Sequence, residues 1–275
     1  MLVDLAFRLL FRDTDNSFCI NGKPLVTQLF PISSIFHRVR AVIFDLDGTL
    51  IDSLGIWNAV DVALVKQLGH SSFSTDELCH FREKALISHA REENPYVGFC
   101  ADLGRLCGSS LSATEIHKMR YQISRRLLRE EMRLRPGAAK VVKKIRSLGM
   151  ETAIATTTKR ANIDIYDQQN TAIMSELKIS EHFPIILSRE NVHSIKPDPE
   201  IYLKALQRLQ LPPSECLVFE DSLAGVMAAR SAGIPVCSIE EPWSLADLPA
   251  IQRLVQKHFR SWQEVWIDLE NSSAF

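Results

Sequence analysis

The chain has 275 residues, of which 46% are hydrophobic and 24% charged, with a formal net charge of −1. This composition is typical of a soluble globular protein that is long enough for one large domain or for one domain with a smaller companion. A net charge near zero gives no bulk attraction to nucleic acid or to a membrane surface, so we expect neither partner. Six cysteines without a CxxC pair or a metal-ligand spacing predict a reducing, cytoplasmic compartment.

Residues 1–38 form an N-terminal extension to which the sequence assigns no role. Within it, Phe18–Val26 predicts a β-hairpin, with Asn21 and Gly22 as the turn. We interpret the extension as a packed arm, with partner binding or regulation as the alternative.

The first strong element is a strand over Ala41–Phe44, a short apolar run rich in β-branched and aromatic residues. Asp45 and Asp47 follow directly. Two carboxylates this close repel each other, so the pKa of one of them rises unless a cation lies between them. A divalent cation would resolve that conflict, while the alternative is a solvated turn at the end of a strand.

A helical region follows, and we expect it to extend to about Arg133. A helix is predicted over Ser53–Leu68 and ends at Gly69. Ser74–Glu77 and Ser112–Glu115 match capping boxes that open two further helices. A buried stripe is predicted on the second of these two helices at Ile116, Met119, Ile123 and Leu127.

Beyond this region, short strands alternate with helices. Strands are predicted over Glu151–Ala155, Pro184–Leu187, Cys216–Phe219 and Ile234–Ser238. Helices are predicted over Pro136–Leu148, from about Asn162, from Pro199 with Asp198 as its cap, and over Ser222–Ala232, with one or two more near the C-terminus. This alternation predicts an α/β fold, a Rossmann-like parallel sheet over 39–54 and 134–270 with an inserted α-helical domain over 55–133.

Polar clusters follow the predicted strands. They are Asp45 with Asp47, Thr156–Arg160, Lys196, and Glu220 with Asp221. Because the carboxyl ends of parallel strands share one edge of a sheet, we expect these clusters to converge. Together they offer a nucleophile, a second acid, hydroxyl donors and a cation, which indicates phosphoryl transfer.

Four motifs in this order resemble the haloacid-dehalogenase superfamily. They are FDLDGTLIDS over Phe44–Ser53, the strand end at Thr156, KPDP from Lys196, and FEDSLAGVMAAR over Phe219–Arg230. The resemblance covers about 39–240. Within this superfamily, the chain is similar to the branch with a helical cap, which includes β-phosphoglucomutases, phosphoglycolate phosphatases and sugar-phosphate phosphatases.

This resemblance implies roles for the clustered residues. Asp45 would attack phosphorus and form an aspartyl-phosphate, while Asp47 would carry the proton to the leaving oxygen and from the attacking water. Thr156 would hydrogen-bond the phosphoryl group. Lys196 would neutralise the charge shared between that group and Asp45, although a surface lysine before a helix is the alternative for Lys196.

The same resemblance implies a Mg²⁺ cofactor. Its ligands would be the Asp45 carboxylate, the backbone carbonyl of Asp47, Asp221, and Glu220 either directly or through water. A helix cap is a second reading of the Glu220–Asp221 pair. The substrate would contact Thr156, Thr157, Lys159 and Lys196; a solvated helix start is the alternative for Lys159.

The implied function is a Mg²⁺-dependent phosphatase acting on a small phosphorylated metabolite, a sugar phosphate or a phosphoglycolate-like ester. Mutases of this branch carry a histidine where this chain has Trp57, which cannot carry a proton and so favours hydrolysis. A phosphomutase is the first alternative, and a non-enzymatic binding protein that retains the fold is the second. We expect a monomer or a weak dimer. Candidates for reading the substrate from the cap are Arg82, Lys84, His89 and Arg91.

Overall fold

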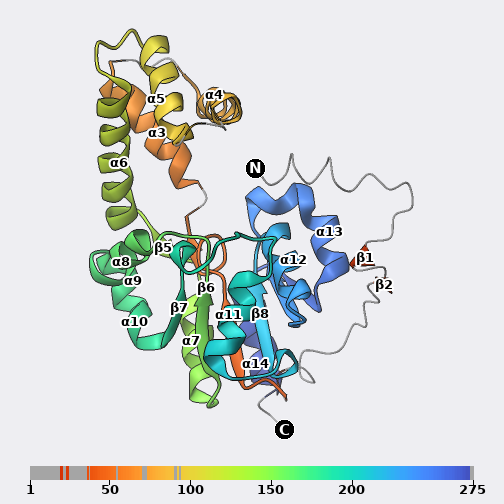
Figure 1. Cartoon of the computed structure of the whole chain (residues 1–275). Helices are drawn as coiled ribbons and strands as arrows, with labels where there is room; N and C mark the ends of the chain where they lie inside the picture. Colours follow the sequence, from red (N-terminus) through yellow and green to blue (C-terminus); the bar gives the residue numbers. More distant parts are fainter. Residues whose placement is uncertain are drawn as a thin grey trace. The chain divides into compact units, whose positions relative to one another are not determined.

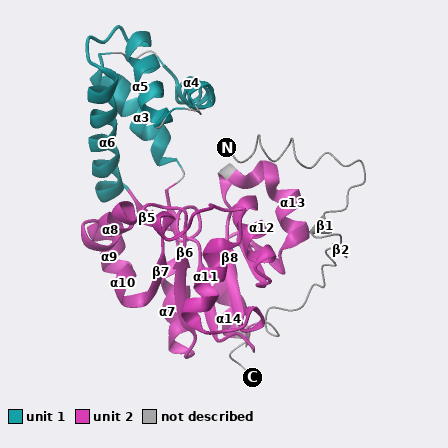
Figure 2. Cartoon of the chain, in the orientation of Figure 1, with its two compact units in different colours: residues 1–14, 55–131 teal, residues 15–54, 132–275 magenta. Residues whose placement is uncertain are grey.

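The computed structural model describes residues 19–20, 23–24, 36, 38–53, 55–69, 73–89, 92 and 94–272. These residues divide into two compact units (Figure 2). The smaller unit holds residues 55–131, and the larger unit holds the described residues before 54 and after 131. All strands of the described chain belong to the larger unit.

The larger unit is built on a six-stranded sheet in which every neighbouring pair of strands is parallel (Figure 1). The order is β10-β9-β8-β3-β6-β7. The strands span β3 (Ala41–Phe44), β6 (Glu151–Ala155), β7 (Ile185–Leu187), β8 (Cys216–Glu220), β9 (Val236–Ile239) and β10 (Lys257–Phe259). β3 lies between β6 and β8, with Phe44 level with Ile154 and Phe219. The predicted α/β class with a parallel sheet is therefore confirmed.

One face of the sheet is covered by α11 (Glu200–Leu209), α12 (Leu223–Ser231) and α13 (Leu248–Leu254). Ile43 and Val218 point to this face and are fully buried against these helices. Burying an aliphatic side chain of this size contributes about 1.5–3 kcal/mol. This layer fixes the sheet against α11 and α12, which begin beside the ends of the strands.

The opposite face carries an aromatic core, because successive side chains of a strand point to opposite faces. Phe44 stacks on Phe219 with 5.7 Å between ring centroids, and Trp262 lies within 6.0 Å of the Phe44 ring and 5.0 Å of the Phe219 ring. Trp262 begins α14 (Trp262–Ser272), which packs beside α7 (Ala138–Ser147). The two strands that carry Asp45 and Glu220 are thus held rigidly from both sides.

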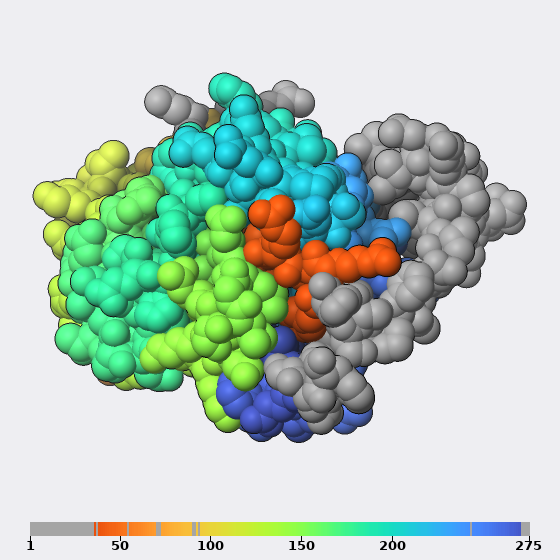
Figure 3. All heavy atoms as spheres, turned by 90° about the horizontal axis from the view of Figure 1, so that it is seen from below, coloured from red at the N-terminus to blue at the C-terminus, as the bar shows by residue number. Residues whose placement is uncertain are grey.

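The amino end of β3 is tied to its two neighbours. In the view from below, the orange segment that leads into β3 lies between green and cyan parts of the chain (Figure 3). Arg40 in this segment bonds to the residues that precede or begin β8 and β6. Its N–H donates to the Glu215 carbonyl at 2.8 Å, and its own carbonyl accepts from the Glu151 N–H at 2.8 Å. These bonds set the register of the three strands and so the relative heights of the residues at their carboxyl ends.

The described part of the smaller unit holds four helices: α3 (Ile56–Gln67), α4 (Thr75–Ser88), α5 (Pro95–Leu106) and α6 (Ala113–Glu130). Both predicted capping boxes are present, since Ser74 and Ser112 each exchange hydrogen bonds with the glutamate three residues later. α6 packs on α3 and on α5.

The predicted stripe on α6 is only partly correct. Ile116 and Ile123 are buried, but Met119 and Leu127 are half-buried. Arg120 and Leu128, each one position later, are the buried residues instead. Arg120 pairs with the fully buried Asp61 inside the unit, so this position of the helix faces inward although it carries a charge.

Smaller elements differ from expectation mainly at their ends. The predicted N-terminal hairpin is present as β1 (Cys19–Ile20) and β2 (Lys23–Pro24), which pair antiparallel; most of the remaining extension lies outside the described residues. β10 was not predicted, because three residues of sequence Lys-His-Phe carry no apolar run. The chain leaves and re-enters the larger unit through β4 (Ile51–Asp52) and β5 (Arg133–Leu134), which pair antiparallel. Among the helices described, none is long and apolar enough for a membrane crossing.

Candidate active site

The polar clusters predicted at the strand ends meet at the carboxyl edge of the sheet. Asp45 continues β3 by one residue, and its N–H donates to the Phe219 carbonyl at 3.0 Å. Glu220 is the last residue of β8 and Asp221 follows it. Thr156 comes directly after β6, and its N–H donates to the Leu187 carbonyl at 3.0 Å. The sheet ladder therefore positions the backbone of all these residues.

Lys196 lies at the centre of this edge and is 6% exposed. Its ammonium donates to Asp45 Oδ1 at 2.6 Å, to Glu220 Oε1 at 2.6 Å and to the Ala155 carbonyl at 2.9 Å. Burial alone would lower the pKa of Lys196, but the charges of Asp45 and Glu220 raise it well above its usual value. The group is therefore a fixed cation with all three donors in use.

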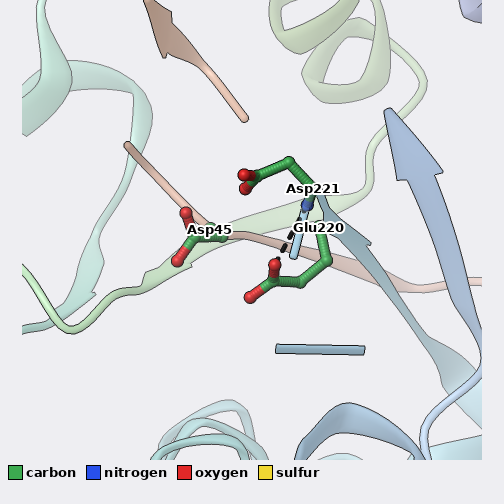
Figure 4. A group of neighbouring side chains, drawn as sticks. All are labelled: Asp45, Glu220 and Asp221. Atoms are coloured by element: carbon green, nitrogen blue, oxygen red, sulfur yellow. Dashed lines mark hydrogen bonds between the residues drawn. The ribbon is translucent and has the colours of Figure 1, made fainter. Parts of the chain in front are cut away.

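Three buried carboxylates lie together at this edge, and two of them contact the ammonium. Oxygen atoms of Asp45, Glu220 and Asp221 lie within 4.8 Å of one another (Figure 4). Burial raises the pKa of Asp45 to about 7, Lys196 opposes that rise and the charge of Glu220 adds to it. Burial raises the pKa of Asp221 well above its usual value, and the charges of Glu220 and Asp45 add to that rise. The donor set consists of oxygen atoms alone and has an excess of negative charge, which suits a hard divalent cation such as Mg²⁺.

Glu220 is the most heavily hydrogen-bonded of these acids. Besides Lys196, Oε1 accepts from the Tyr202 hydroxyl at 3.0 Å. Oε2 accepts from the Asp221 N–H at 3.0 Å and from the N–H and hydroxyl of Ser222 at 3.1 and 3.0 Å. Only glycine fits at position 225, since a Cβ there would lie 1.7 Å from Glu220 Oε1. Glu220 thus ties Lys196 to the first turn of α12.

Asp47 has very different surroundings, made of hydroxyl groups. Its Oδ1 accepts from the Ser53 hydroxyl at 2.5 Å and from the Tyr166 hydroxyl at 3.1 Å. Its Oδ2 accepts from the Thr158 hydroxyl. All three partners are neutral hydroxyls, and together they hold both oxygens of the carboxylate in place.

The residues after β6 divide into two groups. Thr156 is buried and its hydroxyl accepts from the Thr158 N–H at 3.2 Å. Thr157 and Lys159 are exposed, and Lys159 is the residue before α8 (Arg160–Gln168). Thr156 therefore belongs to the cluster, whereas a substrate contact of Thr157 and Lys159 stays a prediction.

Five hydroxyl-bearing residues at this edge were not singled out in the sequence. They are Thr49, Ser53, Tyr166, Tyr202 and Ser222. Thr49 donates to Asp221 Oδ1 at 2.7 Å. Thr49 and Ser53 lie within the first motif, which was a usable signal. Tyr166 and Tyr202 lie inside helices, where an aromatic residue is indistinguishable from core by pattern alone.

The smaller unit has its own buried polar cluster. Asp61, which is fully buried, accepts from Arg82 at 2.5 Å and from Arg120 at 2.7 Å. The guanidinium of Arg120 lies 4.9–5.6 Å from the ring centroids of Trp57, Tyr96 and Phe99. Trp57 is 37% exposed, so it is not a fully packed core aromatic.

The other basic residues predicted to read the substrate are arranged in three ways. Arg82 also donates to Asn58 at 2.8 Å, so it is tied to its own unit. His89 bridges Glu92 and Asp102, and these hydrogen bonds raise the pKa of its imidazole. Lys84 is exposed and Arg91 lies outside the described residues.

Comparisons with known proteins find relatives along most of the chain. A family model for haloacid dehalogenase-like hydrolases matches residues 42–239. Protein CbbY of Rhodobacter capsulatus is 30% identical over 215 residues, which cover 76% of this chain and 89% of CbbY. The phosphorylated carbohydrates phosphatase of Thermotoga maritima is 28% identical over 196 residues, which cover 71% and 82% of the two chains. The crystal structure of CbbY from Rhodobacter sphaeroides in complex with phosphate has a TM-score of 0.61 at 25% identity, covering 84% of this chain and 99% of that one.

Proposed function

Because the chain belongs to the haloacid dehalogenase-like hydrolase family, we propose that it is a Mg²⁺-dependent phosphatase that acts through an aspartyl-phosphate on Asp45. The family and the enzyme class, a phosphoric monoester hydrolase, agree with the expectation from the sequence. One observation carries the proposal: Asp45 is a buried carboxylate paired with a buried lysine amid two further acids. Such an arrangement costs stability, and a reaction on a phosphate ester accounts for it.

In the first step, Asp45 attacks phosphorus, and a bond forms between its carboxylate oxygen and the phosphorus atom. The bond from phosphorus to the ester oxygen breaks, and its electron pair stays on the leaving oxygen. Asp47 gives that oxygen a proton, so the product leaves as an alcohol. Lys196 and the Thr156 hydroxyl stabilise the charge on the phosphoryl group.

In the second step, water attacks the phosphorus of the aspartyl-phosphate. Asp47, now ionised, takes a proton from that water. The bond between phosphorus and the Asp45 oxygen breaks, phosphate is released and both aspartates return to their starting states. Asp47 thus carries one proton out and one proton back in each cycle.

The acids at the site supply ligands for Mg²⁺. Asp45, Asp221 and the backbone carbonyl of Asp47 are the proposed ligands, and Mg²⁺ would neutralise phosphoryl oxygens that are otherwise repelled by these acids. For Glu220 we favour a contact through water, because both of its oxygens already accept hydrogen bonds from Lys196, Tyr202, Asp221 and Ser222.

We propose a phosphorylated carbohydrate or a phosphoglycolate-like ester as the substrate. The names of the relatives support a sugar phosphate, since one of them is a phosphorylated carbohydrates phosphatase. Trp57, which is partly exposed and carries no titratable group, supports hydrolysis over transfer between two hydroxyls of one sugar. A phosphomutase remains the alternative, and product analysis separates the two.

The proposal is tested by phosphate release from p-nitrophenyl phosphate and from a panel of sugar phosphates, phosphoglycolate and nucleotides. We expect activity with Mg²⁺, none with EDTA, and none in Asp45→Asn. Sugar phosphate isomers formed without free phosphate would indicate the mutase. Activity that persists in Asp45→Asn would rule out the aspartyl-phosphate, and no turnover of any ester would overturn the phosphatase.

A further inference from the structure

Tyr166 lies on α8 with its side chain 1% exposed, and its hydroxyl is 3.1 Å from Asp47 Oδ1. A tyrosine hydroxyl at the end of a buried, rigid ring is an expensive group to place inside a protein unless it makes a hydrogen bond. The bond to Asp47 satisfies it. Because the ring is almost fully buried, the packing around it fixes the position of the hydroxyl.

Three separate segments of the larger unit supply the donors to Asp47. Ser53 follows β4, Thr158 lies in the loop after β6, and Tyr166 lies one turn and a half into α8. Ser53 and Tyr166 both bond Oδ1, while Thr158 bonds Oδ2. With both oxygens held, the carboxylate plane cannot rotate freely.

Hydroxyl donors differ from the lysine beside Asp45 in one chemical respect. A hydroxyl both donates and accepts, whereas an ammonium only donates. When Asp47 carries a proton, a neighbouring hydroxyl can turn and accept from it, so the same three partners suit both states of the acid. This is the property that a group shuttling a proton needs.

We propose that Tyr166 is a positioning residue for Asp47, and that its hydroxyl holds the carboxyl group at the angle for proton transfer to the leaving oxygen. The inference rests on the proposed phosphatase function. Tyr166 acts through Asp47 and touches no substrate. Its loss should therefore slow the first step only with those esters whose leaving group needs the proton.

Two aryl esters of similar shape separate this role from a structural one. Phenolate is a poor leaving group that needs protonation, whereas p-nitrophenolate leaves readily without it. For Tyr166→Phe we expect kcat/KM to fall about 10-fold with phenyl phosphate and about twofold or less with p-nitrophenyl phosphate, a fraction of what a general acid contributes. Asp47→Asn should give the same pattern in kcat/KM, which reports the first step alone, with a larger loss on phenyl phosphate.

Thr158→Val removes a second hydroxyl from Asp47 at nearly constant volume and should also slow phenyl phosphate selectively. Tyr121→Phe is the control, because Tyr121 is 51% exposed on α6 and should leave both esters unchanged. Equal losses on both esters in Tyr166→Phe, or no loss on either, would overturn the positioning role. If Asp45→Asn retains activity in the same assays, the proposed phosphatase mechanism fails instead, so the two failures are distinguishable.

Discussion

The two aspartates of the first motif are two residues apart, yet the structure gives them opposite surroundings. Asp45 is buried among charges, with Lys196 2.6 Å away and Glu220 and Asp221 close by. Asp47 is half-buried among hydroxyls from Ser53, Thr158 and Tyr166. Leu46 between them packs into the core and is 1% exposed, so the contrast arises from the partners that each carboxylate meets.

The difference matches the two jobs that phosphoryl transfer requires. A nucleophile has to stay ionised, and a neighbouring ammonium that only donates favours that state. A proton carrier has to exist in both states, and hydroxyl partners tolerate both. Each surrounding therefore predicts how the site responds when it is changed.

The largest effect is expected at Asp45, the aspartate that lies among charged groups. Asp45→Asn replaces the nucleophile with an amide that cannot attack phosphorus, so kcat should fall by about 10⁴-fold or more with any ester. The variant should remain folded, because the amide keeps the size of the side chain and removes one of the repelling charges. Phosphate release measures the loss of activity, and thermal unfolding shows whether the variant is folded. Equal activity in Asp45→Asn and in the unsubstituted protein would contradict the assignment of Asp45 as the nucleophile.

Lys196→Met tests whether the ammonium stabilises the two buried carboxylates beside it. Removing one partner of a buried ion pair typically costs about 3–5 kcal/mol, and here Asp45 and Glu220 both lose their cation. The matched control is Lys204→Met on α11, since the partly exposed Lys204 pairs with Glu200 and should cost about 1 kcal/mol or less. Urea unfolding of both variants gives the comparison, and equal costs would contradict the account.

The acid excess predicts a dependence of stability on pH and on metal. Burial raises the pKa of Asp45 to about 7 and the pKa of Asp221 well above its usual value. The folded, metal-free protein then holds protons that the unfolded chain has released, so its free energy of unfolding falls as the pH rises from about 4 through about 7. Mg²⁺ binds the ionised carboxylates, so it should raise the melting temperature more at about pH 8 than at about pH 5. Equal shifts at both pH values would argue that Mg²⁺ does not bind these acids.

The smallest effect concerns Tyr202, the tyrosine of the ionic side. Tyr202→Phe removes one hydrogen bond to Glu220, worth about 1 kcal/mol, and should slow catalysis about fivefold. Because the loss acts through Lys196 and Glu220, phenyl phosphate and p-nitrophenyl phosphate should slow equally. A loss on phenyl phosphate alone would contradict this assignment, because it is the pattern expected for Tyr166→Phe.

The parallel sheet and the meeting of the polar clusters follow from the sequence, because strands alternate with helices and parallel strands place their carboxyl ends on one edge. β6 was predicted to the residue, and Asp45, Thr156, Lys196 and Asp221 do lie at that edge. The partners of Asp47 could not be predicted in the same way. Ser53 and Thr158 are short polar residues in turns, and Tyr166 has the pattern of a core residue on a helix. Their convergence depends on how α8 packs, which no local pattern records.

The same limit applies to the smaller unit. Arg120 lies at a position that a hydrophobic stripe assigns to a neighbour, and only the buried Asp61 on another helix explains it. β10 has no apolar run of its own and forms by pairing with β9. Tertiary partners decide these elements, whereas the long amphipathic helices and the central strands are decided locally.

The central claim is that Asp45 becomes phosphorylated while Asp47 moves the protons. The most direct test mixes Asp47→Asn with p-nitrophenyl phosphate and Mg²⁺, quenches in acid within the first turnover and locates the phosphoryl group by peptide mass spectrometry. Because p-nitrophenolate leaves without a proton, the first step should proceed, and the second should stall for lack of a base. The account predicts a phosphoryl group on the peptide that contains Asp45, together with one equivalent of p-nitrophenol. Release of p-nitrophenol with no phosphorylated peptide, or a phosphoryl group on another residue, would contradict it.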